Sequence, residues 1–532
     1  MSRLVLGLHF SRNTLVWSGH GMSARPALLP SAITWSSHQR TCIAPYHGTA
    51  RASTDTIYAP ATAPGRAGVA VIRISGPNAA KALMTLDRTR KRLPRPRTLA
   101  LVALEHPVTR ISLDDRALAA WFPGPKSFTG EDTVELHVHG GTAVVAAVLQ
   151  GVAACNNHSR SEEKGGSALF RMAERGEFAM RALANGKLDL AEVEGLKDLI
   201  NAETEVQRQL ASQQASGHFS TQIESWRREI VTCMGHAEAQ LDFGEDEQFD
   251  SGQWQRTSAR ISSLSSSIAA HLATAQRGEI VRSGIRTTLF GVANAGKSSL
   301  INHLARRHVA LVAATPGTTR DVVEARVDVA GYPVLLGDTA GLRTDTDDAV
   351  ERAGVALARN RLANESDLRI WVVDLAASPL ADQIALAAPF PASTGLVVLN
   401  KTDCVDSHFI ECAKAEITDA AKGVPMVMVS MATGTGLADL DATLATVLRD
   451  TYGAGLANSE SATGMVVTNA RHRAHLAECV AALDACVAAA EHDLVIAAEE
   501  LRRAAQSMGR ITGRVDVEDV LDVVFGDFCI GK

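Results

Sequence analysis

The loop Gly291-Val-Ala-Asn-Ala-Gly-Lys297-Ser298 is the most informative segment of this chain. It follows Arg286-Thr-Thr-Leu-Phe290, which predicts a strand, and it precedes Ser-Leu-Ile-Asn-His-Leu, which predicts a helix. A strand, a glycine-rich loop ending in Gly-Lys-Ser and a helix form the P-loop pattern. The glycines let backbone N–H groups approach phosphate oxygens, and the helix N-terminus adds a favourable dipole. The loop therefore predicts a nucleoside triphosphate site without choosing the base.

Two further motifs complete the expected phosphate and Mg²⁺ site. In a P-loop, the side chain of Lys297 contacts the β- and γ-phosphates and the hydroxyl of Ser298 ligates Mg²⁺. Asp338-Thr-Ala-Gly341 follows an apolar run, so Asp338 at a strand end would hold Mg²⁺ through water and Gly341 would donate to the γ-phosphate. Thr319, in Thr315-Pro-Gly-Thr-Thr319, is the expected second protein ligand of Mg²⁺.

The base is predicted by Asn400-Lys-Thr-Asp403, which follows the apolar run Thr394–Leu399. A carboxylate accepts both the N1–H and the exocyclic amine of guanine, whereas adenine would leave it unpaired at a cost of about 1–3 kcal/mol. Val429-Ser-Met-Ala-Thr433 resembles the last guanine-contacting loop, with Met431 in place of the usual Ala.

Each short motif alone has an ordinary structural explanation, because Asp-Thr-Ala-Gly can be a turn and Asn-Lys-Thr-Asp a loop or a helix cap. Four motifs in this order, each after an apolar run, favour a guanine-nucleotide hydrolase. The residues expected to contact GTP are Asn294, Ala295, Gly296, Lys297, Ser298, Ser299, Ala313, Ala314, Thr315, Pro316, Gly317, Thr318, Thr319, Asp338, Thr339, Ala340, Gly341, Asn400, Lys401, Asp403, Ser430, Met431 and Ala432.

Hydrolysis needs a group other than the residue after Gly341, because Leu342 cannot orient a water as the Gln of Ras-like enzymes does. Lys297 is one candidate catalytic residue. Asn294 offers an amide oxygen that suits a monovalent cation near the phosphates. Glu351 could orient the attacking water, although its pattern alone favours a solvated helix residue.

The composition is that of a globular protein of several domains, with 532 residues, 46% hydrophobic and 21% charged residues, and a net charge of −6. The eight cysteines form no CxxC pair, which favours a reducing compartment. No apolar run approaches the length of a membrane span. Residues 1–54 contain five Arg and no Asp or Glu, which fits either a disordered extension or a mitochondrial transit peptide.

The patterning predicts a multidomain α/β plus all-α protein. We expect an α/β domain over 55–186, helices over 187–284, a Ras-like P-loop G domain over 285–452 and further helices over 453–532. Proline is absent from 187 to 284, which favours long helices. Because the helical character is similar before and after the G domain, we favour one helical domain that the G domain interrupts, over separate consecutive domains.

The ends of the chain resemble the MnmE (TrmE) family of tRNA-modifying GTPases. The resemblance rests on Asp55-Thr-Ile-Tyr-Ala-Pro through Ile74-Ser-Gly76, on Phe122-Pro-Gly-Pro-Lys-Ser-Phe-Thr-Gly-Glu-Asp-Thr-Val-Glu-Leu136, on Arg175-Gly-Glu-Phe through Leu188-Asp-Leu190 and on the terminal Cys529-Ile-Gly-Lys532. It covers about 55 to 532, and other P-loop GTPases do not share these blocks.

The resemblance implies a homodimer formed through the N-terminal domain. Such proteins bind a one-carbon folate (5-formyl- or 5,10-methylene-tetrahydrofolate) and act with the FAD- and NADH-dependent protein MnmG (GidA) on C5 of the wobble uridine of tRNA. Folate contacts would fall on Arg73, Glu135, Lys187 and Lys532. The K⁺ that stimulates their GTPase would be held by Asn294, Ala313, Thr315 and Thr318, and Glu351 matches their water-orienting glutamate.

Several positions keep alternative explanations or depart from the family. Arg73 alone reads as an edge-strand salt bridge and Lys187 as a surface residue at a helix start. Ala313 stands where a hydroxyl is common. The segment Cys155–Gly166 reads as an expanded surface loop, and the basic run Arg88–Arg97 as a solvated loop or a tRNA contact.

Two other functions fit parts of the pattern. An Era-like ribosome-assembly GTPase would carry an RNA-binding domain after its G domain, and here helices follow instead. A folate-binding regulator with a decayed nucleotide site conflicts with intact Lys297, Ser298, Asp338 and Asp403.

Overall fold

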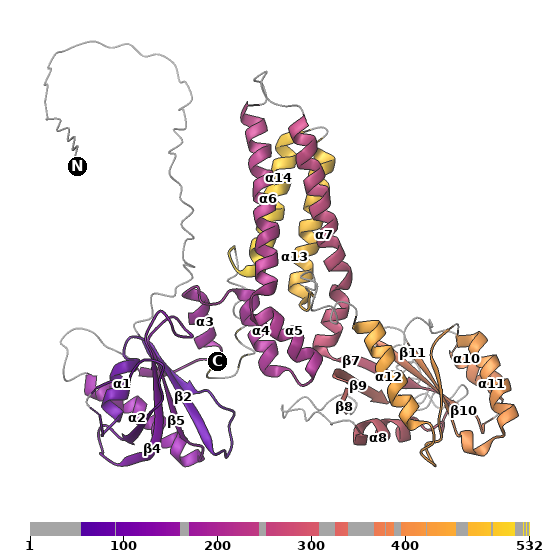
Figure 1. Ribbon diagram of the computed structural model, residues 1–532, viewed down its shortest axis with the longest axis horizontal. Coiled ribbons are helices and arrows are strands. Elements are labelled where there is room, and N and C mark those ends of the chain that lie inside the picture. Colours follow the sequence, from indigo (N-terminus) through magenta and orange to yellow (C-terminus); the bar gives the residue numbers. More distant parts are fainter. Residues whose placement is uncertain are drawn as a thin grey trace, which may run out of the picture. The chain divides into compact units, whose positions relative to one another are not determined.

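The computed structural model describes residues 55–90, 92–159, 170–243, 252–307, 325–338, 366–377, 379–387, 395–421, 423–453, 466–490, 493–515, 525, 528 and 531 (Figure 1). The expectations for residues 1–54 and for the loops that contain Thr319 and Glu351 therefore lie outside the described residues. Among the described helices, none combines the length and the apolar character needed to cross a membrane.

The N-terminal part is a six-stranded mixed sheet with the order β3-β4-β5-β2-β1-β6. Its strands are mostly antiparallel, and only β1 pairs with β6 in parallel. The elements are β1 (Thr56–Pro60), β2 (Val69–Ser75), α1 (Ala79–Leu86), β3 (Ala100–Glu105), β4 (Ser112–Phe122), β5 (Thr133–His139), α2 (Thr142–Ser159), β6 (Phe170–Met172) and α3 (Glu177–Ala184).

Alternation along the strands makes one face of this sheet the core. On β2, Ala70, Ile72 and Ile74 are buried, and they pack with buried residues of β5 such as Leu136. The intervening residues point to the opposite face, where Arg73 lies directly across from Glu135. The alternation therefore places Arg73 and Glu135 on the face opposite the main cluster, where a smaller buried cluster includes Ala59 and Phe178.

Four long helices form a bundle. They are α6 (His218–Phe243), α7 (Gly252–Ser283), α13 (Ala470–Ala489) and α14 (Leu494–Thr512). One hydrophobic cluster joins them, and it includes Ile230, Ile268, Leu483 and Leu501. Because α6 and α7 precede the second sheet in the chain and α13 and α14 follow it, the helical domain is interrupted, as the sequence predicted.

Two shorter helices start with complete capping boxes. Asp189 caps α4 (Leu190–Asn201) together with Glu192, and Thr204 caps α5 (Glu205–Ala215) together with Gln207. Each box satisfies backbone N–H groups that the first helical turn would leave unpaired. The chain therefore breaks between α4 and α5 without a proline.

The second sheet has the order β12-β11-β10-β7-β9-β8, and every neighbouring pair is parallel except β8 with β9. This is the Ras-like arrangement that the P-loop predicted. Its elements are β7 (Ile285–Phe290), α8 (Lys297–Arg307), β8 (Ala325–Val329), β9 (Tyr332–Asp338), β10 (Leu368–Asp374), α10 (Leu380–Ala387), β11 (Gly395–Asn400), the 3₁₀ turn η2 (Thr402–Cys404), α11 (Ser407–Ala421), β12 (Met426–Met428) and α12 (Leu437–Tyr452).

Two local expectations were wrong. Cys155 does not begin a surface loop, because α2 continues to Ser159 and the Cys155 side chain is buried in the core. Arg73 does not lie on an edge strand, because β2 has β5 on one side and β1 on the other. In both cases the packing of neighbouring elements, which a single segment does not reveal, decided the outcome.

Candidate functional site

The phosphate loop connects the end of β7 to the start of α8. Three of its residues have positive φ, namely Gly291 at 152°, Asn294 at 62° and Gly296 at 100°. A Cβ on Gly291 would collide with the carbonyl of Val372, and a Cβ on Gly296 would collide with the amide of Asn400. The two motif glycines are therefore required both for the backbone turn and for close packing.

Lys297 is 7% exposed, and its ammonium folds back on its own loop. It donates to the carbonyls of Gly291 at 3.1 Å and Val292 at 2.9 Å. These contacts hold a positive charge within the curve of the loop, where a phosphate would bind. Ser298, Ser299 and Asn294 are exposed beside it.

Asn400 connects the phosphate loop to the base-recognition loops. Its side-chain Nδ2 donates to the carbonyl of Ala295 at 2.7 Å, and its Oδ1 accepts from the backbone N–H of Met431 at 3.1 Å. Asn400 is only 2% exposed, and its bond to Ala295 is buried while the bond from Met431 is half-buried. One side chain therefore joins three motifs, with its bonded partners Ala295 and Met431 lying 136 positions apart in the chain.

Asp403 is held for recognition by hydrogen bonding. The hydroxyl of the buried Ser430 lowers the pKa of the Asp403 carboxyl, and Cys404 contributes a contact from Sγ at 3.5 Å. The carboxylate is exposed, so it stays ionised and open to a ligand. A charged acceptor in this position suits the paired N–H groups of guanine.

Lys401 forms an ion pair with Asp374, with 2.6 Å between Nζ and Oδ2. Asp374 ends β10, its side chain is 4% exposed, and it also accepts from the backbone N–H of Ala376. The pair fixes Lys401, whose φ of 66° is unusual for a residue other than glycine. The motif search missed Asp374, because no local pattern marks it; only the parallel register of β10 with β11 brings the two together.

The remaining predicted nucleotide residues are described only in part. Asp338 ends β9 directly opposite Leu289 of β7, so the backbone places it at the same sheet edge as the phosphate loop. Ala432 is exposed in the loop after Ser430. Outside the described residues lie Ala313, Ala314, Thr315, Pro316, Gly317, Thr318, Thr319, Thr339, Ala340, Gly341 and Glu351.

The cation sites can be tested against the described donors. Within the described ranges no group of three or more His, Cys, Asp or Glu side chains could hold a metal ion. A Mg²⁺ site that shares its ligands with phosphates does not need such a group. The exposed Ser298 hydroxyl and the exposed Asn294 amide, both beside the phosphate loop, fit hard cations that oxygen ligands bind.

A second candidate site surrounds Arg73 on the other face of the N-terminal sheet. Its guanidinium donates to Glu135 Oε1 from Nε at 3.1 Å and from Nη2 at 2.9 Å. The rings of Phe128 and Phe178 lie against the guanidinium, with their centroids 5.0 and 5.7 Å from Cζ. His137 follows on the same strand, with Nε2 3.8 Å from Glu135 Oε2. The arrangement offers a cation, a carboxylate and the half-buried ring of Phe128 to one ligand, while the fully buried Phe178 supports the guanidinium from the core.

Of the other predicted folate residues, Lys187 lies within the described residues and Lys532 does not. Lys187 is exposed, and its Cγ is 3.3 Å from the position that a Cβ on Gly130 would occupy. Lys532 is outside the described residues, but its neighbour Gly531 lies against the carbonyl of Pro60 with φ of 100°. Pro60 is next to Ala59, which pairs with Arg73, so the end of the chain reaches the same strands.

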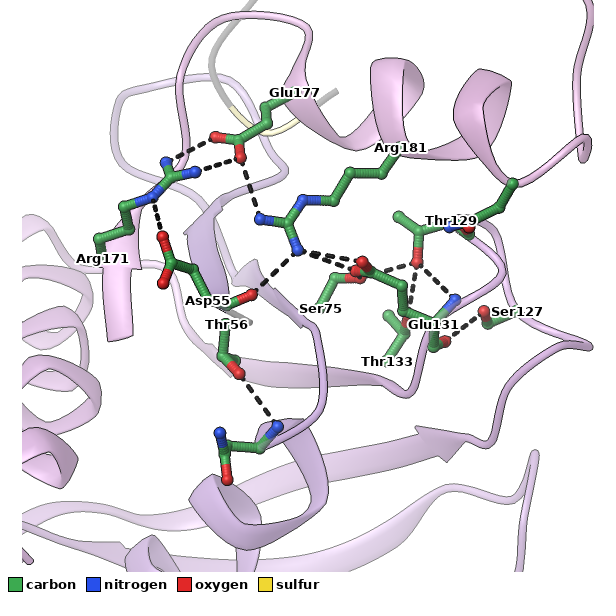
Figure 2. Close-up of polar contacts among 12 residues, drawn as sticks. Asp55, Thr56, Ser75, Ser127, Thr129, Glu131, Thr133, Arg171, Glu177 and Arg181 are labelled. Carbon is green, nitrogen blue, oxygen red and sulfur yellow. Dashed lines mark hydrogen bonds and ion pairs between the residues drawn. The ribbon is translucent and has the colours of Figure 1, made fainter. Parts of the chain in front are cut away.

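A network of charged side chains supports this second site, and sequence reasoning missed it (Figure 2). Arg181 of α3 bonds to Glu131 and Glu177, and Arg171 of β6 bonds to Glu177 and Asp55. Burial opposes ionisation of Glu177, yet the two guanidinium groups lower its pKa. Partners up to about a hundred residues apart left no spacing signal that could have identified the network.

The comparisons with known proteins cover both sites. Residues 56–187 match the family described as "GTP-binding protein TrmE N-terminus", and residues 190–529 match the "MnmE helical domain". One structural likeness is Aquifex aeolicus Era bound to GDP and AlF4⁻, with 23% identity, 30% of this chain and 56% of that chain covered, and a TM-score of 0.26.

Relatives match along most of the chain. "tRNA modification GTPase MnmE" of Parvibaculum lavamentivorans is 45% identical over 90% of this chain and 100% of its own length. "5-taurinomethyluridine-[tRNA] synthase subunit GTPB3, mitochondrial" of Danio rerio is 41% identical over 90% of this chain and 93% of its own. At this identity and coverage, the chain belongs to the MnmE (TrmE) family of tRNA modification GTPases.

Proposed function

We propose that this protein is a potassium-stimulated GTP hydrolase that takes part in modifying C5 of the wobble uridine of tRNA. The observation that carries the GTPase assignment is the junction at Asn400, where the phosphate loop and both base-recognition loops meet through two hydrogen bonds of one buried side chain. The tRNA modification is supported by the full-length relatives, whose names specify tRNA modification and tRNA taurinomethyluridine synthesis.

In the nucleotide site, Lys297 binds the phosphates and Asp403 selects guanine. Ser298 and Thr319 would hold Mg²⁺, and Asn294, Ala313, Thr315 and Thr318 would hold K⁺. Both cations, when bound, supply positive charge that offsets the charge developing on the phosphate oxygens. Glu351 would orient the attacking water in place of the Gln that Leu342 cannot supply.

In the second site, we propose a 5-formyl- or 5,10-methylene-tetrahydrofolate bound at Arg73, Glu135, Lys187 and Lys532. The geometry around Arg73 supports this ligand, because a pterin presents N–H donors to a carboxylate, a flat ring to the phenylalanine Phe128 and an acceptor to a guanidinium. The folate would supply the one-carbon unit that is added to uridine.

The partners follow from the same proposal. The protein would form a homodimer through the N-terminal domain, and it would act with the FAD-dependent MnmG protein, as the word "subunit" in the name of the Danio rerio relative supports for that relative. We also propose the domain limits 55–186, 187–284, 285–452 and 453–532. The relatives include bacterial and mitochondrial proteins, and we place this chain in a bacterial cytoplasm, with a mitochondrion as the alternative.

The cation dependence gives the sharpest test of the hydrolytic mechanism. GTP hydrolysis by the full-length protein should be several times faster in KCl than in NaCl at equal ionic strength. Replacing Asn294 with Ala should remove that difference. Equal rates in the two salts for the parent protein would exclude the monovalent-cation mechanism, while GTP binding, measured separately, would still test the nucleotide site.

The tRNA assignment needs a separate measurement. Deleting the gene should remove the C5 substituent of the wobble uridine, which nucleoside mass analysis detects, and returning the parent gene should restore it. The same nucleosides in the deleted and parent strains would contradict the assignment. Restoration by a Lys297→Ala variant that binds no GTP would show that hydrolysis is not required.

A further inference from the structure

Arg181 is the contact point of three separate segments of the N-terminal domain (Figure 2). Its Nη1 donates to both carboxylate oxygens of Glu131, at 3.1 and 3.0 Å, and to the carbonyl of Asp55 at 3.1 Å. Its Nη2 donates to Glu177 at 3.1 Å. The Arg181 side chain is only 8% exposed. One buried guanidinium thus ties the β4–β5 loop, the start of β1 and the first turn of α3 together.

The segments that Arg181 joins also carry the two aromatic rings that pack against Arg73, of which Phe128 is half-buried and Phe178 is fully buried. Phe128 lies in the same loop as Glu131, three residues before it, and Phe178 directly follows Glu177 in α3. Both rings contact the guanidinium of Arg73, from separate elements. The position of the Arg73 guanidinium against these rings therefore depends on how firmly the loop is held to α3.

Further bonds fix the loop at its Glu131 end. The Ser75 hydroxyl donates to Glu131 at 2.8 Å and lies 2.7 Å from the Thr129 hydroxyl, and the side-chain amide of Asn185 donates to the Thr129 carbonyl at 2.7 Å. Within the described residues, Arg181 provides the only positive charge that contacts Glu131.

The charges of the network oppose separation of the β4–β5 loop from α3. The network holds the three carboxylates of Asp55, Glu131 and Glu177 and the two guanidinium groups of Arg171 and Arg181. Separating the loop from α3 would leave Glu131 without its guanidinium partner in a site where its side chain is 20% exposed. Because a partly buried carboxylate that loses its partner is strongly disfavoured, the β4–β5 loop and α3 are expected to move as one unit.

We propose that Arg181 is a positioning residue for the one-carbon folate: through Glu131 and Glu177 it keeps the rings of Phe128 and Phe178 against the guanidinium of Arg73, and so holds Arg73 in place for the ligand. This inference rests on the folate site proposed above. Arg181 does not touch the ligand in this account, because its donors are occupied by the loop, the strand and the helix.

The test measures the affinity of the full-length protein for 5-formyl-tetrahydrofolate by calorimetry. Arg181→Lys keeps the charge but cannot reach three segments at once, so the Kd should rise about tenfold, the scale expected when Arg73 is displaced by a fraction of an ångström. Glu131→Gln should have a similar effect. Because the two changes break the same contact, the double variant should lose no more than about the larger single loss.

A matched control separates positioning from general destabilisation. Arg471 of α13 is a half-buried arginine that likewise bonds to one carboxylate, Glu194, and to backbone carbonyls, those of Arg510 and Ile511. Arg471→Lys should lower the melting temperature but leave the folate Kd unchanged. A second readout is the tRNA modification reaction with the partner protein, where Arg181→Lys should raise the KM for 5,10-methylene-tetrahydrofolate far more than it lowers kcat.

Three outcomes would count against the inference or its foundation. No folate binding by the parent protein would remove the proposed folate site itself. Parent-like affinity in Arg181→Lys, with folate bound by the parent, would overturn the positioning role alone. Equal losses in Arg181→Lys and Arg471→Lys, or a fall in kcat at an unchanged KM, would show that Arg181 is merely structural.

Discussion

Replacing Asn400 with Ala should weaken the nucleotide site by an amount that its two bonds determine. The side chain accepts from Met431 and donates to Ala295, and both partners are backbone groups in the interior of the site. Each such group left buried without a partner costs about 1–3 kcal/mol. Because water can enter the vacated space and satisfy part of the demand, we expect a total of about 2–4 kcal/mol.

This cost can appear in either of two measurements. If the loops of the variant keep their arrangement, the free energy of unfolding falls. If they relax apart, GDP must restore the arrangement on binding, and the affinity falls instead, by about tenfold for each 1.4 kcal/mol. The sum of the two losses is therefore the quantity to compare with about 2–4 kcal/mol. GDP affinity is measured by titration with a fluorescent analogue, and unfolding by urea in its absence.

Asn156→Ala is the matched control. Asn156 also makes two hydrogen bonds to backbone, both to Phe170, at 2.8 and 2.7 Å, but in the N-terminal domain. The Asn156→Ala variant should have a lower free energy of unfolding and an unchanged GDP affinity. A summed loss below about 1 kcal/mol in Asn400→Ala would refute the reasoning, because a single neutral hydrogen bond already contributes about that much.

Three further predictions concern other contacts. Asp374→Asn preserves the shape but removes the charge facing Lys401, so GDP affinity should fall about tenfold; an unchanged Kd would mean that the ion pair does not position the base loop. Gly531→Ala places a Cβ against the carbonyl of Pro60 and should weaken folate binding. Gly186 also has positive φ, but a Cβ there would meet only open space, so Gly186→Ala should leave folate binding unchanged. Equal folate Kd values for the two variants would refute this prediction. Burial alone would raise the pKa of Glu194, but His472 and Arg471 lower it by more, so that the pKa falls to about 2. The stabilising contribution of Glu194 is therefore present above about pH 4.5 and is lost as the pH falls toward 2. The melting temperature of Glu194→Gln should depend less on pH over that range than that of the parent protein, and parallel curves would contradict the assignment.

The sequence predicted the features that lie within one segment. The P-loop, the Asn400–Asp403 motif and the long helices each depend on neighbouring residues, and the structure places them as expected. The prediction that the G domain interrupts a helical domain also held, because the two halves of the bundle share one apolar pattern. Thr319 and Glu351 stay predictions, since they lie outside the described residues.

The residues that hold those groups in place could not be predicted. Asp374 supports Lys401 across two adjacent strands, and Arg181 supports a loop that is 50 residues earlier in the chain. A charged residue at the end of a strand or inside a helix is common in any sequence, so its type carries no information about its partner. Only the register of the strands and the packing of α3 select these pairs among many possible ones.

The pairing of Arg73 with Glu135 restricts what the second site can bind. A purely anionic ligand would have to compete with Glu135 for the guanidinium, and it would approach that carboxylate at close range. A ligand with N–H donors for Glu135 and an acceptor for Arg73 can join the existing pair without breaking it. Because Arg73 donates only to Oε1, the Oε2 of Glu135 has capacity for such donors, with the His137 ring 3.8 Å away. The mixed edge of a pterin has this combination, whereas a simple carboxylate or phosphate does not, so an inorganic anion at the same concentration should fail to displace the folate.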